Sequence, residues 1–498
     1  MSAKNIWLGN ERWPGNKSCG DFARDVFRLA RAKTDKRKAL AFYDWLTRCL
    51  MRGANLQLPN GAGGYSRCYE PLVLLASWGH GECTFWGWIA TECLCAAGLK
   101  ARRVVAHNNG HTFYEVWYTG DDGRGQWHAF DPFIGWFFLN ERGEVASCEE
   151  LAANPRLVQD PLPGHPVPLG HHPERSGIGH RHRLEDQVFI EQPMRNDVNA
   201  WELQKGMEVA FNFMPEVSGE ALFEKTGDGN PVSSHCDIAE LNRGGFVAQP
   251  KHMPYWKNYL WPTENTDGLN EGRPVRWHGA GALRWTPLKH GKTVVEESHN
   301  AKFENGILKL AGRHDFAEVW YHFKLPYLVS RVVVDYDVVG SGGDYFGLSL
   351  SADGGRTIWP MKLKANAPHY GVARNGRAQR LAGEPSVQGL REFWLRVDFS
   401  SHASPLTFAV QALRISVGFQ HNMHLQPRLL PGANPIWLEA GKLDSGDKLQ
   451  AEWIFQKNGK EERARLELAK AGKVSDKVNL KARCPSEILM TGIRLTCM

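Results

Sequence analysis

The sequence predicts an α+β protein in which a mixed N-terminal domain is followed by antiparallel β-sandwich domains. In two stretches before residue 98, apolar side chains recur at helical spacing, as Phe22, Val26 and Leu29 do. Beyond residue 200 apolar side chains alternate with polar ones, which is typical of strands with one buried face. The 51 glycines and 19 tryptophans of the 498-residue chain fit many turns and broad, flat apolar surfaces.

Three helices are expected in the N-terminal part of the chain. Two of them lie between Ser18 and Arg52, with Thr34 as the N-cap of the second and Gly53 as its stop. A third runs from Cys83 to Ala97 and ends at Gly98, a residue type that readily adopts the left-handed conformation found at helix ends.

Strands follow once the apolar period changes from about four residues to two. In the N-terminal part three are expected, at Arg103–Ala106, Thr112–Tyr118 and Gln126–Phe130, and the turn at 120–123 joins the last two. In the C-terminal part, the clearest alternations are Met207–Phe213, Val332–Val338, Phe393–Phe399 and Leu406–Phe419.

Composition shifts divide the chain into five predicted segments. They are a catalytic domain (1–160), a loop or linker rich in Pro, Gly and His (161–200), a β-rich connecting domain (201–294), a β-sandwich (295–440) and a C-terminal β extension (441–498). Within the sandwich, Ser351–Trp359 resembles the Asp-box of sialidases. Such a segment ties a turn by side-chain hydrogen bonds, so we expect a hairpin tip there.

Charge and hydropathy exclude several classes of partner. The net charge of +6 comes from 60 basic and 54 acidic residues that are dispersed along the chain, so a nucleic-acid-binding protein is not indicated. No apolar run reaches the roughly 18 residues that a membrane helix needs. Residues 1–20 lack a secretion signal, which favours the cytoplasm. The β-rich tail favours export if the chain starts within a longer precursor, so the compartment stays open.

No metal or cofactor is expected. The ten cysteines contain no C-x-x-C pair and no regular spacing, so neither a zinc site nor a disulfide framework is indicated. Five histidines in the loop match no ligand pattern, and a solvated loop is the simpler interpretation. They are His165, His171, His172, His180 and His182.

Three residues in chain order suggest cysteine chemistry. Cys83 is expected at a helix N-terminus, where unpaired backbone N–H groups and the helix dipole favour the thiolate. His111 begins a strand and could form an ion pair with that thiolate, then protonate a leaving amine. Asp131 ends the next strand and could fix the imidazole tautomer. The alternative is that Cys83 is a buried structural cysteine.

The motif order resembles the transglutaminase-like superfamily. It consists of Gly81–Cys83 at a helix start, then Ala96–Val104, then His111–Val116, then Trp127–Pro132. The resemblance covers residues 18–160, about a third of the chain. The layout with a β-rich tail is also similar to large uncharacterised bacterial proteins with this domain.

The resemblance implies a papain-like core with Cys83 as nucleophile, His111 as base and acid, and Asp131 as orienting group. Thr84 follows the cysteine where many transglutaminases have Trp, and no acidic calcium loop is visible. Hydrolysis of an amide or other acyl bond in a protein, peptide or glycopeptide is therefore favoured over cross-linking. We expect the Cys83 backbone N–H to be one oxyanion donor and Trp78 a second one, with Glu115 as a supporting carboxylate.

Other assignments remain open. His128 is a competing base, although it lies on the opposite strand face from Asp131, and His107 falls in the turn before the strand. A different class of function is a carbohydrate- or glycoprotein-binding protein whose first domain is inactive or subordinate. Aromatic faces would stack on sugars in that case, and the candidates are Trp320, Trp359 and Trp394. Carbohydrate cleavage would need a pair of carboxylates that the sequence does not locate.

Overall fold

The fold is taken from a computed structural model of the whole chain. The residues described are 2–52, 57–59, 65–81, 83–106, 111–132, 137–159, 187–190, 198–213, 278–312, 316–340, 344–364, 376–380, 387, 389–401, 408–422, 425–469, 476–485 and 489–498.

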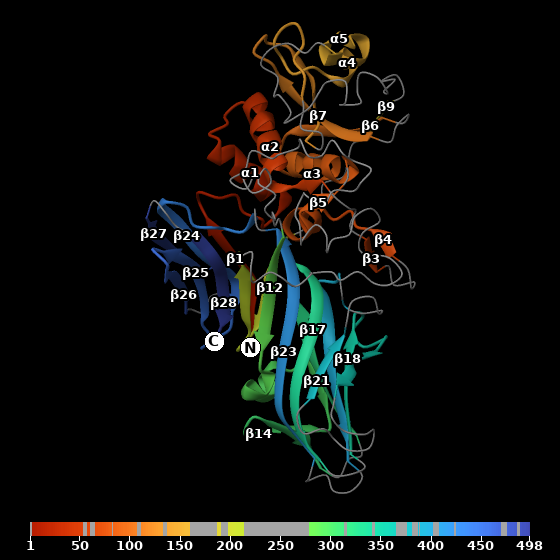
Figure 1. Ribbon diagram of the computed structural model, residues 1–498, viewed down its shortest axis with the longest axis vertical. Helices are drawn as coiled ribbons and strands as arrows, with labels where there is room; N and C mark the ends of the chain where they lie inside the picture. The colour runs from red at the N-terminus through yellow and green to blue at the C-terminus, as the bar shows by residue number, and fades with distance from the viewer. Residues whose placement is uncertain are drawn as a thin grey trace.

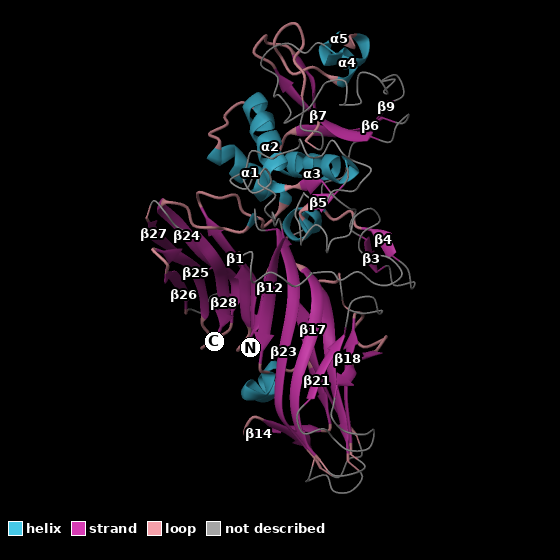
Figure 2. Cartoon of the chain, in the orientation of Figure 1, coloured by secondary structure: helices cyan, strands magenta, loops and turns pink. Residues whose placement is uncertain are grey.

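The chain is mostly β, so the predicted α+β class with a papain- or transglutaminase-like N-terminal domain is wrong. Within the described residues, 28 strands stand against five α-helices. Figure 2 shows the strands extending over most of the molecule, while the α-helices gather at one end. The physical reason is that long alternating segments dominate the C-terminal half, and the N-terminal segment β1 (Ser2–Asn10) also forms a strand there. The sequence pattern predicted helices from Ser18 onward and did not predict the strand β1 before them.

The largest sheet has eleven strands and lies below the helices in Figure 1. Its ordered path is β20 (Lys362–Lys364), β21 (Gly376–Arg380), β17 (Leu328–Val339), β23 (Ala409–Asn422), β12 (His278–Trp285), β11 (Glu208–Asn212), β28 (Leu489–Cys497), β25 (Leu449–Lys457) and β26 (Lys460–Leu468). The hairpin β14 (Ala301–Glu304) and β15 (Ile307–Leu310) joins at β23.

Two further sheets pack against the largest one. One has the order β10 (Trp201–Gln204), β1, β24 (Gly432–Leu443), β27 (Asp476–Cys484). The other has the order β13 (Glu297–His299), β16 (Ala317–Lys324), β22 (Glu392–Ser400), β18 (Tyr345–Ser351), β19 (Trp359–Pro360). Rings from facing sheets meet in the core, as Trp201 does with Phe211 and Trp285 with Tyr321. We call these three sheets the β body.

The helices and a small sheet form a second part, which we call the helical region. Its helices are α1 (Cys19–Leu29), α2 (Asp35–Cys49), the π-helix η1 (Val73–Trp78), α3 (Cys83–Ala96), α4 (Cys148–Ala153) and α5 (Arg156–Gln159). A 3₁₀ helix, η7 (Pro287–Val294), lies outside it, between β12 and β13. Thr34 caps α2 by accepting from the backbone of Arg37, as the sequence predicts.

The small sheet of the helical region is antiparallel. Its order is β8 (Gly125–Phe130), β7 (His111–Thr119), β6 (Lys100–Ala106), β9 (Gln187–Ile190). Two strand pairs of two or three residues complete the region, β2 (Met51–Arg52) with β5 (His80–Gly81) and β3 (Gln57–Pro59) with β4 (Tyr65–Arg67). The helix α3 packs on β6 and β7, so its first residue lies beside the start of β7.

Strand pairing crosses every predicted domain boundary. β1 pairs with β24, which joins the segment predicted as catalytic to the segment predicted as a sandwich. β11 pairs with β28 from the predicted C-terminal extension. Both ends of the chain lie in the β body (Figure 1), where the backbone of Ala3 donates to the thiol of Cys497. The predicted boundaries are therefore not places where pairing stops.

Polar bonds join the helical region to the end of β23. Ser77 Oγ in η1 donates to the carbonyl of Gln420 (2.8 Å), and Asn422 Nδ2 donates to the carbonyls of Cys49 (2.8 Å) and Leu75 (2.9 Å). All of these side chains are buried. Because a buried polar group is costly when unpaired, these bonds fix η1, the segment that precedes Cys83, against the β body.

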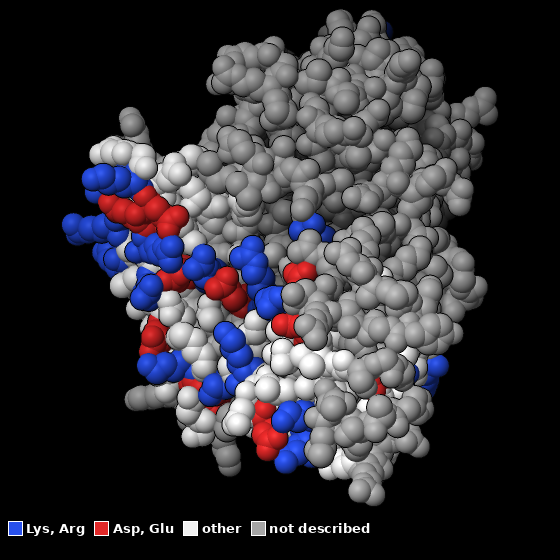
Figure 3. Space-filling view, turned by 60° about the horizontal axis from the view of Figure 1, so that its bottom comes forward, with Lys and Arg blue, Asp and Glu red and all other residues white. Residues whose placement is uncertain are grey.

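The exposed charges of the β body are mixed in sign. Figure 3 shows Lys and Arg side chains interleaved with Asp and Glu on the face that it presents. Several pairs are bonded, as in Arg465–Glu452 and Lys448–Glu467. Among the described helices, none has the length and apolarity that a membrane span requires.

Candidate functional site

Cys83 is the first residue of α3 and is partly exposed. The helix lies close to β7 because Gly87 has no side chain there: a Cβ on Gly87 would meet Thr112 Cγ2 at 3.1 Å and the carbonyl oxygen of Phe113 at 3.2 Å. The hydroxyls of Thr84 and Thr112 are 3.3 Å apart. This close packing brings the start of the helix to the start of the strand, where His111 lies.

His111 and Asp131 meet across the β7–β8 pair. In the register, Tyr114 lies opposite Phe130, so the first residues of β7 lie beside the residues that follow β8. His111 Nε2 is 2.5 Å from Asp131 Oδ2. The carboxylate is fully buried, and the imidazole is 11 % exposed. Alternation along the two strands is sufficient to predict this meeting.

The other side of the imidazole reaches the cysteine. Cys83 and His111 are joined by a side-chain hydrogen bond, and the backbone N–H of Thr112 also donates to the sulfur. Since Nε2 is engaged with Asp131, Nδ1 is the ring nitrogen that faces the thiol. The structure thus brings Cys83, His111 and Asp131 into one hydrogen-bonded chain.

The electrostatics of the chain favour charge separation. Burial alone would raise the pKa of Cys83, but the charge and hydrogen bond of His111 and the N–H of Thr112 outweigh burial and lower it. Burial would lower the pKa of His111, but the charges and hydrogen bonds of Asp131 and Cys83 raise it to about 10. With the thiol pKa below its usual value of 9.0 and the imidazole pKa at about 10, the thiol loses its proton before the imidazole does, so the thiolate–imidazolium pair is the form that follows as the pH rises.

Trp78 lies at the end of η1 and is fully buried. Its carbonyl accepts a hydrogen bond from Gln420 Nε2 at 3.3 Å, so it belongs to the contact between the helical region and the β body. Downstream, the indole N–H of Trp86 donates to the carbonyl of Gly81 (3.1 Å) and fixes the approach to Cys83. The role of Trp78 as an oxyanion donor stays a prediction.

Glu115 is a buried carboxylate with a structural role. Its Oε2 accepts from Arg102 Nε (2.8 Å), and its Oε1 accepts from the backbone N–H of Cys148 (2.7 Å). The side chain is fully buried, and burial raises its pKa despite the Cys148 N–H and the Arg102 charge. Glu115 therefore ties β6 and β7 to the start of α4 and supports the sheet that carries His111.

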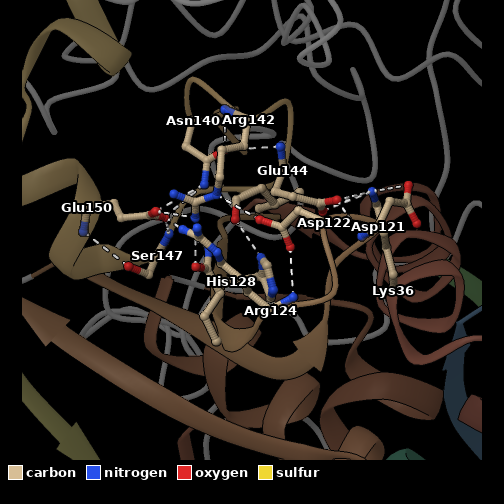
Figure 4. Close-up of polar contacts among 12 residues, drawn as sticks. Lys36, Asp121, Asp122, Arg124, His128, Asn140, Arg142, Glu144, Ser147 and Glu150 are labelled. Carbon is tan, nitrogen blue, oxygen red and sulfur yellow. Dashed lines mark hydrogen bonds and ion pairs between the residues drawn. The ribbon is translucent and has the colours of Figure 1, made fainter.

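His128, the competing base, lies within the β7–β8 pair, opposite Val116. Its Nδ1 is 2.5 Å from the carbonyl oxygen of Val145, and its ring stacks on Tyr118 at a centroid distance of 3.5 Å. Burial lowers its pKa. Figure 4 shows His128 within a polar network that includes Lys36, Glu144 and Arg142. His128 therefore stays neutral and structural, while His107 lies outside the described residues.

Two kinds of residue near the site were not predicted. The N–H of Thr112 donates to the sulfur, and its place next to His111 in sequence is the signal that could have revealed it. Tyr43 and Tyr114 are close enough to Asp131 to be affected by its charge. Burial, and after it the charge of Asp131, raises the pKa values of both phenols. Tyr43 comes from α2, so no sequence spacing points to it.

The residues considered for metal binding and for sugar stacking are not part of the cysteine site. Within the described residues, no group of three or more His, Cys, Asp or Glu side chains is arranged to hold a metal ion, and the histidine-rich loop lies outside those residues. Trp320 and Trp394 are on β16 and β22, where they alternate with fully buried residues and face away from the core. Trp359, in contrast, packs against the core.

The Asp-box-like segment forms the turn between β18 and β19. Ser351 Oγ accepts from the backbone N–H of Gly355 (2.8 Å), and Asp353 Oδ1 accepts from that of Thr357 (2.8 Å). These bonds tie the turn in the way expected of a hairpin tip.

Comparison with known proteins gives no family for this chain. No family model matches it, and no curated protein matches it. Two solved structures of the pilus backbone protein RrgB from Streptococcus pneumoniae overlap 39 % of this chain at 9 % and 8 % identity, each with a TM-score of 0.11. The chain covers 43 % and 31 % of those two structures, so it spans less than half of their length. A TM-score this low carries no argument about fold or function.

Proposed function

We propose that the protein is a cysteine-dependent enzyme that acts on an amide or related acyl bond through a thioester intermediate. The observation that supports this most is the hydrogen-bonded chain from Cys83 through His111 to Asp131, with the sulfur partly exposed at the first residue of a helix. The burial of the three side chains fits nucleophilic catalysis, because the Asp131 carboxylate is buried and the Cys83 sulfur is partly exposed.

In the first half-reaction the Cys83 thiolate attacks the carbonyl carbon, and a C–S bond forms as the carbonyl π pair moves to oxygen. Backbone N–H groups at the start of a helix point out of its N-terminus, and those at the start of α3, including that of Cys83, would donate to this oxyanion. The His111 imidazolium then gives its proton to the leaving nitrogen. The C–N bond breaks, the amine departs and a thioester remains.

In the second half-reaction the neutral His111 imidazole takes a proton from water. The resulting hydroxide adds to the thioester carbon, and the C–S bond breaks. A carboxylic acid leaves, and the thiolate–imidazolium pair is restored. Asp131 holds the ring orientation through its bond to Nε2 and stabilises the imidazolium in both halves. An amine in place of water would give acyl transfer by the same steps.

The motif order in the sequence supports the same chemistry. It resembles the transglutaminase-like superfamily, whose members use cysteine, histidine and aspartate in this chain order. Thr84 directly after the cysteine departs from the cross-linking members, so we propose hydrolysis ahead of cross-linking. The proposed substrates are proteins, peptides or glycopeptides.

The test compares hydrolysis and transfer directly. The protein is incubated with a peptide mixture in ¹⁸O-water that contains a fluorescent primary amine, and products are read by mass spectrometry and fluorescence. Hydrolysis predicts ¹⁸O at new carboxyl termini, whereas transfer predicts the fluorescent adduct. Cys83→Ser should remove both signals, and Cys95→Ser is the matched control because Cys95 is also a partly exposed cysteine of α3. Equal turnover by Cys83→Ser would overturn the proposal.

Carbohydrate binding by the β body is a second candidate. It is favoured by two indoles on the outer face of the five-stranded sheet, Trp320 and Trp394. The Trp394 ring stacks on His322 at 4.7 Å, which holds it flat. Retention of Cys83→Ser on a glycan array, with loss in Trp394→Ala, is the result expected. If Trp394→Ala and Trp320→Ala bind the array like the parent protein, this candidate fails.

A further inference from the structure

The outer face of the largest sheet carries a hollow of about 460 Å³ over three neighbouring strands, β17, β23 and β12. We call it the arginine hollow, after the three guanidinium groups among the residues that line it: Arg284, Arg331 and Arg414, with Trp285, Thr286, Val333, Asp335, Ile415 and Ser416. It is separate from the cysteine site, which lies in the helical region.

Strand register explains why a hollow exists there. Ser416 on the central strand lies opposite Arg284 on one side and Val333 on the other. Two residues further along, Gly418 lies between Ala282 and Arg331. Small side chains therefore form the floor, while the long arginine side chains stand around it. Ile415 and Val417, which alternate with these positions, point into the core.

The Arg331 side chain lies across the central strand. A Cβ on Gly418 would meet Arg331 Cγ at 2.8 Å and Arg331 Nε at 3.1 Å. The side chain of Arg331, from β17, thus lies against Gly418 of β23. Glycine at 418 is what leaves room for this conformation.

The described residues that line the hollow carry a net positive charge. They include three arginines and one aspartate, Asp335, which gives a formal charge of +2 (three positive minus one negative). Arg414 and Arg284 are exposed. The carboxylate nearest to Arg284 in the described part of the chain is Glu208, with 3.9 Å between Nη1 and Oε1, and the Arg284 side chain is 66 % exposed. Elsewhere on the same sheet, Arg463 is bonded to both Glu452 and Glu461.

We propose that the arginine hollow binds the oxyanion of a small molecule, a phosphate or sulfate ester group. Planar guanidinium groups bind the oxygens of such groups in pairs, and several of them around one point favour a group with three or four oxygens. The Ser416 hydroxyl on the floor offers a further donor. A volume of about 460 Å³ also accommodates the sugar or similar body that bears the ester.

The test is calorimetric titration of the full chain at low salt. The probes are inorganic phosphate, inorganic sulfate, glucose 6-phosphate and glucose 6-sulfate, and glucose is the neutral control. We expect the charged probes to bind and glucose not to. Preference for glucose 6-phosphate or for glucose 6-sulfate identifies the ester, and either preference supports the proposal.

Variants of the exposed arginines complete the test. Arg284→Ala and Arg414→Ala should each weaken binding about tenfold, the loss expected for one charge-assisted contact. Arg463→Ala is the matched control on the same sheet and should change affinity less than about twofold. The proposal is overturned if no charged probe binds at about 10 mM, an affinity too weak for a built site. It is also overturned if the double variant Arg284→Ala/Arg414→Ala binds as the parent protein does.

Discussion

The β7–β8 pair holds two histidines in opposite electrostatic settings, His111 at the start of β7 and His128 within β8. At one end His111 lies between the carboxylate of Asp131 and the thiol of Cys83, and its pKa rises to about 10. Within β8, His128 lies against the carbonyls of Val145 and Tyr118, and burial lowers its pKa. One strand pair therefore carries a charged imidazole and a neutral one.

The difference teaches that the partner of a buried histidine decides its role. A carbonyl acceptor fixes the ring but compensates burial only weakly, so the neutral form is retained. A carboxylate on one nitrogen and an acidic thiol on the other favour the imidazolium, which is the form that can protonate a leaving group. Residue type alone does not separate the two histidines.

The largest effect is expected from removing each histidine in turn. His111→Ala should lower turnover of an amide substrate by about 1,000-fold or more, because it removes both the ion pair and the proton donor. His128→Ala should leave turnover within a few-fold and lower the free energy of unfolding by about 2 kcal/mol, through lost packing and bonds. Steady-state kinetics and urea unfolding measure the two. Equal loss of turnover in both variants would break the comparison.

Glu115 lies in the middle of β7, opposite Ala129, and provides a test that separates supporting groups from reacting ones. Glu115→Ala leaves Arg102, whose side chain is 13 % exposed, without its buried carboxylate. We expect the free energy of unfolding of this variant to be about 3 kcal/mol lower than that of the parent protein. The rate of Cys83 alkylation in the folded protein should stay unchanged. Chemical denaturation and alkylation kinetics check both parts. A changed Cys83 alkylation rate in folded Glu115→Ala would place Glu115 in the reactive chain instead.

The ion pair should also leave a signature in stability against pH. Between the lowered pKa of the folded thiol and 9.0, the pKa of the free thiol, the folded pair holds its one proton on His111 and the unfolded pair holds its one proton on Cys83, so the contribution of the pair is flat. The stability that the lowered pKa of Cys83 contributes is lost as the pH falls through the pKa of the folded thiol. Above 9.0 the folded state holds more protons than the unfolded state, so stability falls with rising pH up to about 10, where His111 loses its proton. The slope above 9.0 is at most about 1.4 kcal/mol per pH unit.

The measurement is the free energy of unfolding of the parent protein minus that of Cys83→Ala/His111→Ala, at closely spaced pH values. A fall between pH 9.0 and about 10 is expected in the difference. A difference that stays level from pH 9.0 to 10 would contradict the ion pair, because the folded state would then hold no extra proton on His111.

The smallest effect is expected in the polar network around His128. Lys36 Nζ bonds to Asp121 (2.7 Å) and to the buried Glu144 (2.9 Å). Lys36→Met should lower the free energy of unfolding by about 1 kcal/mol, and Asp121→Asn by less than about 0.5 kcal/mol, because Asp121 is 86 % exposed. Thermal unfolding measures both. An equal loss in the two variants would contradict the assignment of the buried Glu144 as the important partner.

Local features of the helical region follow from the sequence. The N-cap at Thr34 and the left-handed Gly98 depend on neighbouring residues, and the structure has both. The meeting of His111 with Asp131 follows from alternation on two strands joined by a short turn. The contact between Cys83 and His111 additionally needs the close packing at Gly87, which the sequence offers only as one more glycine.

Long-range pairing could not be predicted in the same way. β1 pairs with β24, more than four hundred residues away, and nothing within Ser2–Asn10 identifies that partner. The π-helix that ends at Trp78 depends on bonds from Gln420 and Asn422. The α+β class failed for this reason: periodicity assigns individual elements, whereas the partners of the strands determine how far the β body extends.

The pH dependence of Cys83 alkylation by iodoacetamide tests the central claim most directly. Peptide mapping gives the rate at Cys83 separately from that at the other cysteines, in the parent protein, His111→Ala and His128→Ala. The ion pair predicts an inflection below pH 9.0 in the parent protein and in His128→Ala, and one above pH 9.0 in His111→Ala, because burial then acts on the thiol without the imidazolium. An inflection at or above pH 9.0 in the parent protein, or the same inflection in all three, would contradict the account.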